Sequence, residues 1–201
     1  TAAEVVSMRM SSGDDASCLN MQRPESPRVI GVPQRLIERN AFTFTKVRDA
    51  NGAEDNPWEL LNRDLPEGKD GTLVIPTIAD AASAQWILKK GLGDRITVPG
   101  KGGNQLQLQL VGLLAPSIFA SELLISDADY RTYFGSDGGY RYFLVDTPDG
   151  KADGVREALS ANLGELGLSV ERTSDVLASL ARVQNTYLAA FSTLGGLGLL
   201  L

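Results

Sequence analysis

The sequence contains no histidine and only one cysteine, Cys18, among its 201 residues. Without histidine the chain has no Ser-His or Cys-His nucleophile pair, and it lacks a common zinc ligand. A single cysteine cannot form a disulfide within the chain, so it does not fix the redox compartment. We therefore expect no catalytic residue, no cofactor-binding residue and no metal-binding residue.

Basic residues are also in deficit. The chain has 19 Lys and Arg against 25 Asp and Glu, which gives a net charge of −6. Neutralising phosphates requires a basic surface, so the balance argues against a nucleic-acid partner and against a basic patch for anionic lipid. The numbering starts at Thr1, without an initiator Met or a signal-peptide pattern, and we expect a fragment of a longer chain.

The last fifteen residues, Tyr187–Leu201, carry no charge at all. A membrane span needs about 20 apolar residues, so this run would be the first part of one, whereas a buried C-terminal helix is the alternative. Glycines weaken a soluble helix but are common in membrane helices, which favours the membrane. One apolar stripe at helical spacing leads into this run: Val176, Leu180, Val183, Tyr187, Phe191 and Leu194. We predict that 174–201 is a helix leading into the membrane.

Alternation, apolar periodicity and turn residues predict the remaining elements. Strands are expected at 5–10, 28–32, 42–47, 72–77, 95–98, 105–114, 122–125, 140–145 and 168–172, and helices at 34–40, 58–61, 80–90, 127–134 and 155–166. Asp80, Asp127 and either Ser174 or Asp175 are the expected N-caps. Their mixed order predicts an α+β fold.

The densest polar cluster is Gly13-Asp14-Asp15 followed by Ser17-Cys18. Two carboxylates could bind a divalent cation, and Cys18 could act as a nucleophile. A calcium loop needs more oxygen ligands at regular spacing, and an activated thiol needs a base or an electropositive setting. A solvated turn with a small buried thiol is the favoured interpretation.

Three other groups have a plain structural explanation beside a functional one. The segment Gly100–Gly103 lacks the spacing of a phosphate-binding loop and predicts a hairpin turn. Asp127 and Asp129 could pair as acid and base, although helix capping explains Asp127. Seven clustered aromatic residues are expected in the core, and any exposed share would mark a partner surface: Phe119, Tyr130, Tyr133, Phe134, Tyr140, Tyr142 and Phe143.

Several segments carry a family resemblance. Asn185-Thr-Tyr-Leu, followed by Phe191 and Leu194-Gly-Gly-Leu-Gly-Leu-Leu, resembles the second transmembrane helix of the FtsX/MacB-like ABC transporter permeases. Trp86–Val98 and then Leu106–Leu114 are similar to that family's small helix, glycine turn and two strands. Gly13–Asn20 with Pro27–Pro33 resembles a subgroup of these permeases.

The resemblance implies a two-lobed MacB-like periplasmic core domain between two transmembrane helices. Residues 1–75 and 140–173 would form a porter-like strand–helix–strand lobe, and 76–139 an inserted, mostly β lobe. Residues 174–201 would lead into the bacterial inner membrane, with the domain on its extracytoplasmic side. The chain departs from the family pattern in starting late and in the segment around Trp58, which leaves the cargo open.

The implied function is coupling of cytoplasmic ATP hydrolysis to export, to lipoprotein handling or to periplasmic mechanotransmission. The implied partners are a cytoplasmic ABC ATPase subunit, a second permease copy and a periplasmic protein or lipoprotein. The chain would then not be an enzyme itself. Two alternatives stay open at this point: a membrane-anchored sensor or ligand-binding domain, and an enzyme that uses a cysteine or carboxylates.

Overall fold

The structure, a computed structural model, describes residues 3–13, 27–48, 55–68, 71–120 and 122–182. It divides into two compact units, Glu4–Asp146 and Thr147–Leu201 with Thr1–Ala3. We call the first the body and the second the C-terminal unit. All buried hydrophobic side chains of the described residues lie in the body. The body is therefore the part of the chain that has its own core.

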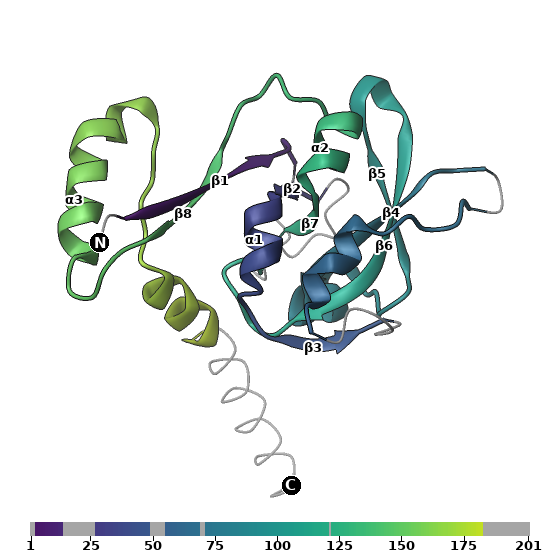
Figure 1. Cartoon of the computed structure of the whole chain (residues 1–201), viewed down its shortest axis with the longest axis horizontal. Helices are drawn as coiled ribbons and strands as arrows, with labels where there is room; N and C mark the ends of the chain where they lie inside the picture. Colours follow the sequence, from purple (N-terminus) through teal and green to yellow (C-terminus); the bar gives the residue numbers. More distant parts are fainter. Residues whose placement is uncertain (1–2, 14–26, 49–54, 69–70, 121, 183–201) are drawn as a thin grey trace, which may run out of the picture. The chain divides into compact units, whose positions relative to one another are not determined.

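One mixed sheet forms the body (Figure 1). Its strand order is β3-β6-β4-β7-β2-β1-β8, and β5 also pairs with β6. β2 pairs with β7 and β4 with β6 in parallel, and the other pairs are antiparallel. The strands are β1 (Glu4–Met10), β2 (Val29–Val32), β3 (Phe44–Val47), β4 (Val74–Asp80), β5 (Arg95–Pro99), β6 (Gln105–Leu114), β7 (Leu123–Ser126) and β8 (Tyr142–Asp146). The predicted α+β class is confirmed.

Short helices accompany the sheet. The body contains α1 (Gln34–Arg39), α2 (Asp127–Tyr133), 3₁₀ segments at Pro57–Asn62 and Lys101–Gly103, and a π-helical segment at Ser83–Leu88. The C-terminal unit contains α3 (Ala152–Leu163) and a 3₁₀ turn at Gly164–Leu166. Residues 173–182 are also helical. Apart from residues 168–172, treated below, each predicted element has a counterpart, displaced at its ends by a few residues.

Each face of the sheet carries its own hydrophobic cluster. The first cluster contains Trp58 and Phe119, both fully buried, together with α1 and part of β1. The Trp58 indole Nε1 donates a hydrogen bond to the Ala41 carbonyl at 2.6 Å, which satisfies its one polar atom. The second cluster packs α2 and the π-helical segment onto the other face. Both faces are covered, which explains why β2 and β4 are buried along their whole length.

The longest strand, β6, shows the predicted division of its two sides. Four of its five leucines enter the second cluster, starting with Leu106 and Leu108, and Leu114 enters the first. The glutamines between them find polar partners, because Gln107 accepts from Arg95 at 2.9 Å and Gln109 donates to the Gly93 carbonyl at 2.8 Å. Gln109 is buried, so its hydrogen bond offsets the cost of removing an amide from water.

Gly31 allows α2 to lie directly on β2. A Cβ atom at this position would stand 2.8 Å from Cβ of Tyr130 and 3.2 Å from Oδ1 of Asp127. No side chain fits in that space without a shift of the helix. The glycine therefore fixes where the first turn of α2 begins.

The prediction for the segment after Asp80 was right about its start and wrong about its end. Oδ1 of Asp80 accepts from the backbone N–H groups of Ala82 and Ser83 at 2.9 and 3.1 Å, as an N-cap does. The coil then widens to a π-helix and ends at Leu88, with Lys89 in the left-handed region at φ 53°. The helix was predicted to run through Lys90, yet it ends at Leu88 and a lysine, instead of the glycine that usually takes the left-handed conformation, follows it.

The C-terminal unit differs from its prediction in two places. Residues 168–172 form no strand, because side-chain alternation alone supplies no neighbouring strand to pair with. The helix that follows already includes Thr173, and the N–H groups of Asp175 and Val176 bond to the Arg172 carbonyl. Neither Ser174 nor Asp175 is therefore its cap. Asp153 of α3 pairs with Arg172 at 2.5 Å, which ties the helix start to α3.

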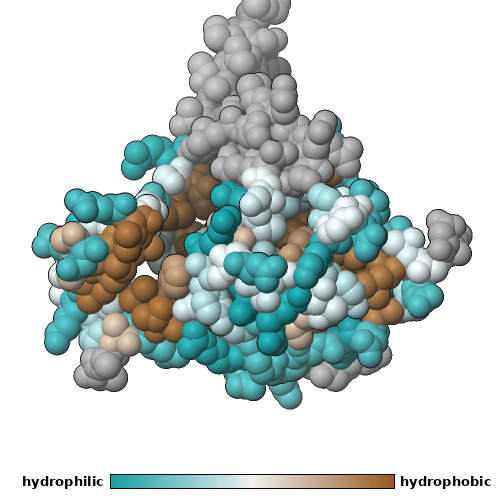
Figure 2. All heavy atoms as spheres, turned by 90° about the horizontal axis from the view of Figure 1, so that it is seen from above, coloured by the Kyte–Doolittle hydropathy of each residue, from teal (hydrophilic) through white to brown (hydrophobic). Residues whose placement is uncertain are grey.

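Hydrophobic surface is visible over the C-terminal unit in Figure 2. None of its described residues is buried, and Leu166 is 82% exposed. The amphipathic helix α3 therefore presents apolar side chains without a core of its own.

Two sets of predictions fall outside the described residues. These are the Asp14, Asp15, Ser17 and Cys18 cluster and the uncharged run Tyr187–Leu201. Across the ranges that the structure describes, no helix has the length and apolar character of a membrane span. The structural boundary follows Asp146, whereas the sequence analysis grouped 1–75 with 140–173; that assignment to lobes stays a prediction.

Candidate functional site

The chain passes between the two units twice, both times at the same end of one β-ribbon. β1 and β8 pair antiparallel from Glu4↔Asp146 to Met8↔Tyr142. The body begins at Glu4 and ends at Asp146, so its two covalent connections to the C-terminal unit leave from paired residues. A displacement carried along the chain would therefore reach the body through this ribbon.

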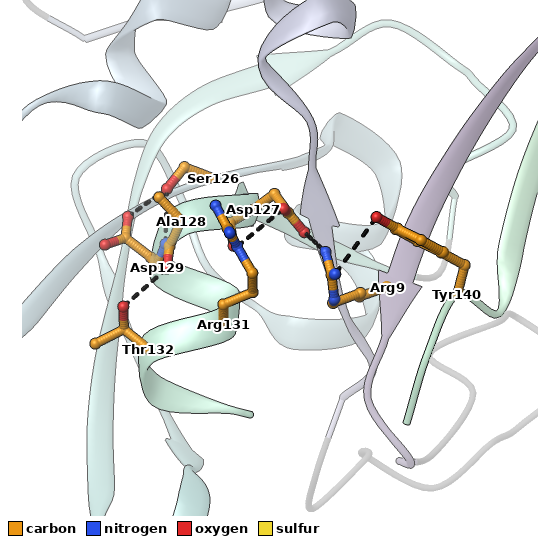
Figure 3. Close-up of polar contacts among 8 residues, drawn as sticks. All are labelled: Arg9, Ser126, Asp127, Ala128, Asp129, Arg131, Thr132 and Tyr140. Atoms are coloured by element: carbon orange, nitrogen blue, oxygen red, sulfur yellow. Dashed lines mark hydrogen bonds and ion pairs between the residues drawn. The ribbon is translucent and has the colours of Figure 1, made fainter. Parts of the chain in front are cut away.

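An ion-pair cluster joins the ribbon to the rest of the body (Figure 3). Nη1 of Arg9, on β1, contacts Oδ1 of Asp127 at 2.6 Å, and Nε of Arg131 contacts Oδ2 of the same carboxylate at 3.2 Å. Asp127 begins α2, which packs on β2. Tyr140 approaches from the segment before β8, and its ring lies 4.5 Å below the Arg9 guanidinium. We call Arg9, Asp127, Arg131 and Tyr140 the Arg9 cluster.

The Arg9–Asp127 pair is largely withdrawn from water. The two side chains are 14% and 19% exposed, whereas Arg131 is 55% exposed. The hydrogen bond that Arg9 donates to Asp127 raises the pKa of Arg9 above its ordinary value, against the opposing effect of burial. A pair in this setting is screened less than a surface pair, and it joins β1 to α2, whereas Arg131 and Asp127 form a pair within α2.

A second ion-pair group lies at the outer end of the ribbon. Arg39, at the end of α1, contacts Asp146, and it also lies 4.0 Å from Glu4. The hydrogen bond to Asp146 raises the pKa of Arg39. All three side chains are well exposed, so this group contributes less than about 1 kcal/mol. The partly buried Arg9 pair thus joins the ribbon to α2, and the exposed Arg39 pairs join its outer end more weakly to α1.

A pocket of about 200 Å³ opens beside the inner end of the ribbon. The two stacked rings of Tyr130 and Phe134 form one wall, with centroids 5.3 Å apart. The other lining residues are Met10, Ser11, Ser12, Gly135, Gly138, Gly139 and Arg141. Burial raises the pKa of Tyr130, and the nearby positive charges of Arg141 and Arg9 oppose that shift.

Asp127 and Asp129 are engaged with different partners. Asp127 is not the cap of α2 but its first residue, and its carboxylate is held by the two arginines. Ser126 is the N-cap, since its Oγ accepts from the Asp129 N–H at 3.1 Å and donates to Asp129 Oδ2 at 2.7 Å. Burial raises the pKa of Asp129. The structure gives Asp127 a role in an ion pair and Asp129 a role in supporting the N-cap residue Ser126 (Figure 3).

The glycine-rich segment and most of the aromatic residues singled out from the sequence have structural roles. Gly100–Gly103 lies in the hairpin turn between β5 and β6, as predicted, with Gly102 and Gly103 at φ 73° and 80°. Within the described parts of the chain, no cluster of three or more Cys, Asp or Glu residues could hold a metal ion. Five of the seven aromatics belong to or pack against the two clusters, whereas Tyr140 and Phe143 are the exposed share.

No local sequence pattern indicates the Arg9 cluster. Arg9 and Asp127 are 118 positions apart, and each fits an ordinary solvent-facing position in its own element. Only the pairing of β1 with β2, and of β2 with β7, brings the two elements together. A covarying pair in related sequences would be the signal that could reveal such a contact.

The fold and the ribbon define an α+β domain that is joined at one edge of its sheet to a second unit. No protein-family model and no curated protein matches the chain. Among solved structures, it is similar to the extracellular domain of the noncanonic ABC-type transporter YknZ from Gram-positive bacteria. The sequence identity is 16% and the TM-score 0.37, over 81% of this chain and 74% of the other.

Proposed function

We propose that the chain is the extracytoplasmic domain of an FtsX/MacB-like ABC transporter permease in the bacterial inner membrane. The observation that carries the proposal is the uncharged run Tyr187–Leu201, which follows a folded α+β body and begins five positions after the last described helical residue, Arg182. Such a run suits entry into a bilayer, where charged side chains are costly. The sequence resemblance described above supplies the family.

In this proposal the domain performs no catalysis. A separate cytoplasmic ABC subunit hydrolyses ATP, and two permease copies form the transporter. The domain has a porter-like lobe and an inserted β-rich lobe. It passes motion from the membrane to a cargo, a lipoprotein or a periplasmic partner.

The ribbon suggests how motion would reach the body. The helix at 173–182 connects to the body through residues 147–172, and the body receives that connection at Asp146, opposite Glu4. A stiff helix transmits displacement along its axis, whereas a broken helix absorbs it. The Arg9 cluster then holds the ribbon on the sheet, so that the body follows.

The first test is purification of the full-length protein from the membranes of its own cells. We expect an ATP-binding-cassette subunit to co-purify, and residues of the body to be cut by protease added to intact spheroplasts. Co-purification of a signalling kinase, with no ATPase, would instead support the membrane-anchored sensor. Protection of the body from external protease would contradict the extracytoplasmic placement.

The second test breaks the helix. Arg182→Pro removes a backbone donor and costs about 3 kcal/mol of helix stability. We expect the variant to retain ATP hydrolysis in the purified complex but to fail to complement a strain that lacks the permease. Arg182→Ala removes the same side chain and keeps the helix, so it should complement. Equal complementation by both variants would contradict transmission through this helix.

A further inference from the structure

The pocket beside the ribbon has an uneven chemical lining. Among the lining residues that the structure describes, Arg141 is the one that carries a charge, and Tyr130 and Phe134 supply apolar rings. Ser11 and Ser12 add two hydroxyl groups. The positive charge of Arg141 favours an anionic ligand at this pocket, in a chain whose net charge is −6.

The backbone of Arg141 is held by a hydrogen bond, whereas its guanidinium makes only one weak contact among the described residues. Its N–H donates to the Met8 carbonyl at 3.0 Å, which holds the residue against β1. Its Nη1 lies 3.5 Å from Oγ of Ser12, a weak contact that leaves most of the guanidinium donors available. Within the described ranges, no carboxylate lies at ion-pair distance from Arg141, whereas Arg9 is neutralised by Asp127.

Ser11 offers a further donor. Its Oγ accepts from the Val29 N–H at 2.9 Å, and its own N–H donates to the Val29 carbonyl at 2.9 Å. Both backbone contacts hold Ser11 in place, and the hydroxyl proton is not used by either of them. A bound acceptor at the pocket would therefore find Ser11 already positioned.

We propose that this pocket binds a single carboxylate attached to an apolar or aromatic group, as at the C-terminus of a peptide. The guanidinium of Arg141 matches a carboxylate in shape and donates two parallel hydrogen bonds to it. One cation balances one negative charge, which fits a carboxylate better than the nearly double charge of a phosphate. The Tyr130 and Phe134 wall takes the apolar group, which would shield the ion pair from water.

The size of the pocket limits the ligand. Drug-sized molecules occupy cavities of about 300–1,000 Å³. A volume of about 200 Å³ fits one residue or a small organic acid. The proposal concerns the body alone and does not depend on the transporter function.

The test is a titration of the whole chain, kept in mild detergent, followed by the NMR amide signals of Gly135, Gly138 and Gly139. N-acetylphenylalanine represents a terminal carboxylate, the α-amide of N-acetylglutamate (free side-chain carboxylate) an acidic side chain, and N-acetylphenylalanine amide the uncharged control. We expect the first probe to shift the glycine signals in a saturable manner and the amide not to. Binding by the glutamate probe alone would assign the site to acidic side chains.

Variants connect the binding to Arg141. Arg141→Gln should weaken binding of N-acetylphenylalanine about tenfold or more, because it removes a charge-assisted pair. Arg141→Lys keeps the positive charge but lacks the planar guanidinium. Its affinity for N-acetylphenylalanine should lie between that of the parent and that of Arg141→Gln. Arg35→Gln is the matched control, since Arg35 is exposed on α1 and does not line the pocket. Equal affinity for acid and amide, no binding of either acid, or binding unchanged in Arg141→Gln would overturn the proposal.

Discussion

At the scale of single residues, the Arg9–Asp127 pair makes a prediction about stability. Asp127→Asn leaves the Arg9 guanidinium, 14% exposed, without its counter-charge. Breaking a fully buried pair costs about 3–5 kcal/mol, and partial exposure reduces this to about 1–3 kcal/mol. We expect that decrease in the free energy of unfolding, measured by urea denaturation followed through tryptophan fluorescence.

Arg131 provides the matched control for this pair. It contacts the same carboxylate but is 55% exposed. Arg131→Gln should therefore change the free energy of unfolding by less than about 0.5 kcal/mol. If both variants lost the same stability, the Arg9–Asp127 contact would not be the anchor of the ribbon.

Asp80 makes a prediction about pH. Burial raises the pKa of its carboxyl above the ordinary 3.8, and backbone hydrogen bonds from Ser83 and Ala82 only partly oppose this. Between 3.8 and the raised value, the folded state binds more protons than the unfolded state, so this group makes stability fall as pH rises. Asp80→Asn keeps the Oδ1 acceptor and removes that dependence.

The comparison is made by urea denaturation at a series of pH values from about 3.5 to 7, a window that follows from the ordinary carboxyl pKa. We expect the Asn variant to gain stability relative to the parent as pH rises. Asp80→Ala also removes the acceptor for two backbone N–H groups and should lose about 1–2 kcal/mol. A constant difference between the parent and the Asn variant would show that Asp80 does not titrate differently on folding.

At the scale of elements, the end of the π-helical segment is strained. Lys89 has φ 53°, a conformation that costs a non-glycine residue about 1–2 kcal/mol. Lys89→Gly should relieve this cost, partly offset by the greater freedom of glycine in the unfolded chain, and stabilise the body by about 0.5 kcal/mol. Lys90→Gly is the control and should be neutral or destabilising. A loss of stability in Lys89→Gly would contradict strain at this position, and thermal denaturation measures both variants.

Which elements could be predicted follows from the kind of signal each carries. The alternation of Leu106 and Leu108 with glutamines identifies β6, because burial on one face of a strand repeats every two residues. The same alternation at Leu168 and Val170 is misleading, since a strand also requires a neighbour and local sequence does not encode one. The left-handed Lys89 was missed for a related reason, because the π-helix that places it there is set by packing of Ala84 and Leu88 in the second cluster.

At the scale of the whole molecule, contacts between segments that are distant in the chain could not be predicted from the sequence. The α+β class followed from the order of elements, but the Arg9 cluster depends on the strand order, which joins residues 118 positions apart. The pocket wall of Tyr130 and Phe134 was predicted only as part of an aromatic group. Its pairing with Arg141 required the placement of α2 beside the start of β8.

The division of the chain makes the last prediction. Every member of the two hydrophobic clusters lies between Val6 and Leu144, so the described residues of the C-terminal unit contribute none. Burial of apolar surface is the main favourable term in folding. A chain of residues 4–146 should therefore fold without the rest, with a free energy of unfolding within about 1 kcal/mol of the body in the full chain, since the outer ion pairs of Arg39 are retained and are weak. Urea denaturation and dispersed amide NMR signals would measure this.

A matched chain ending at 140 lacks β8, exposes the Met8 side of β1 and should be markedly less stable. If residues 4–146 failed to fold while the full chain folded, the C-terminal unit would be part of the core and the ribbon would not be a boundary.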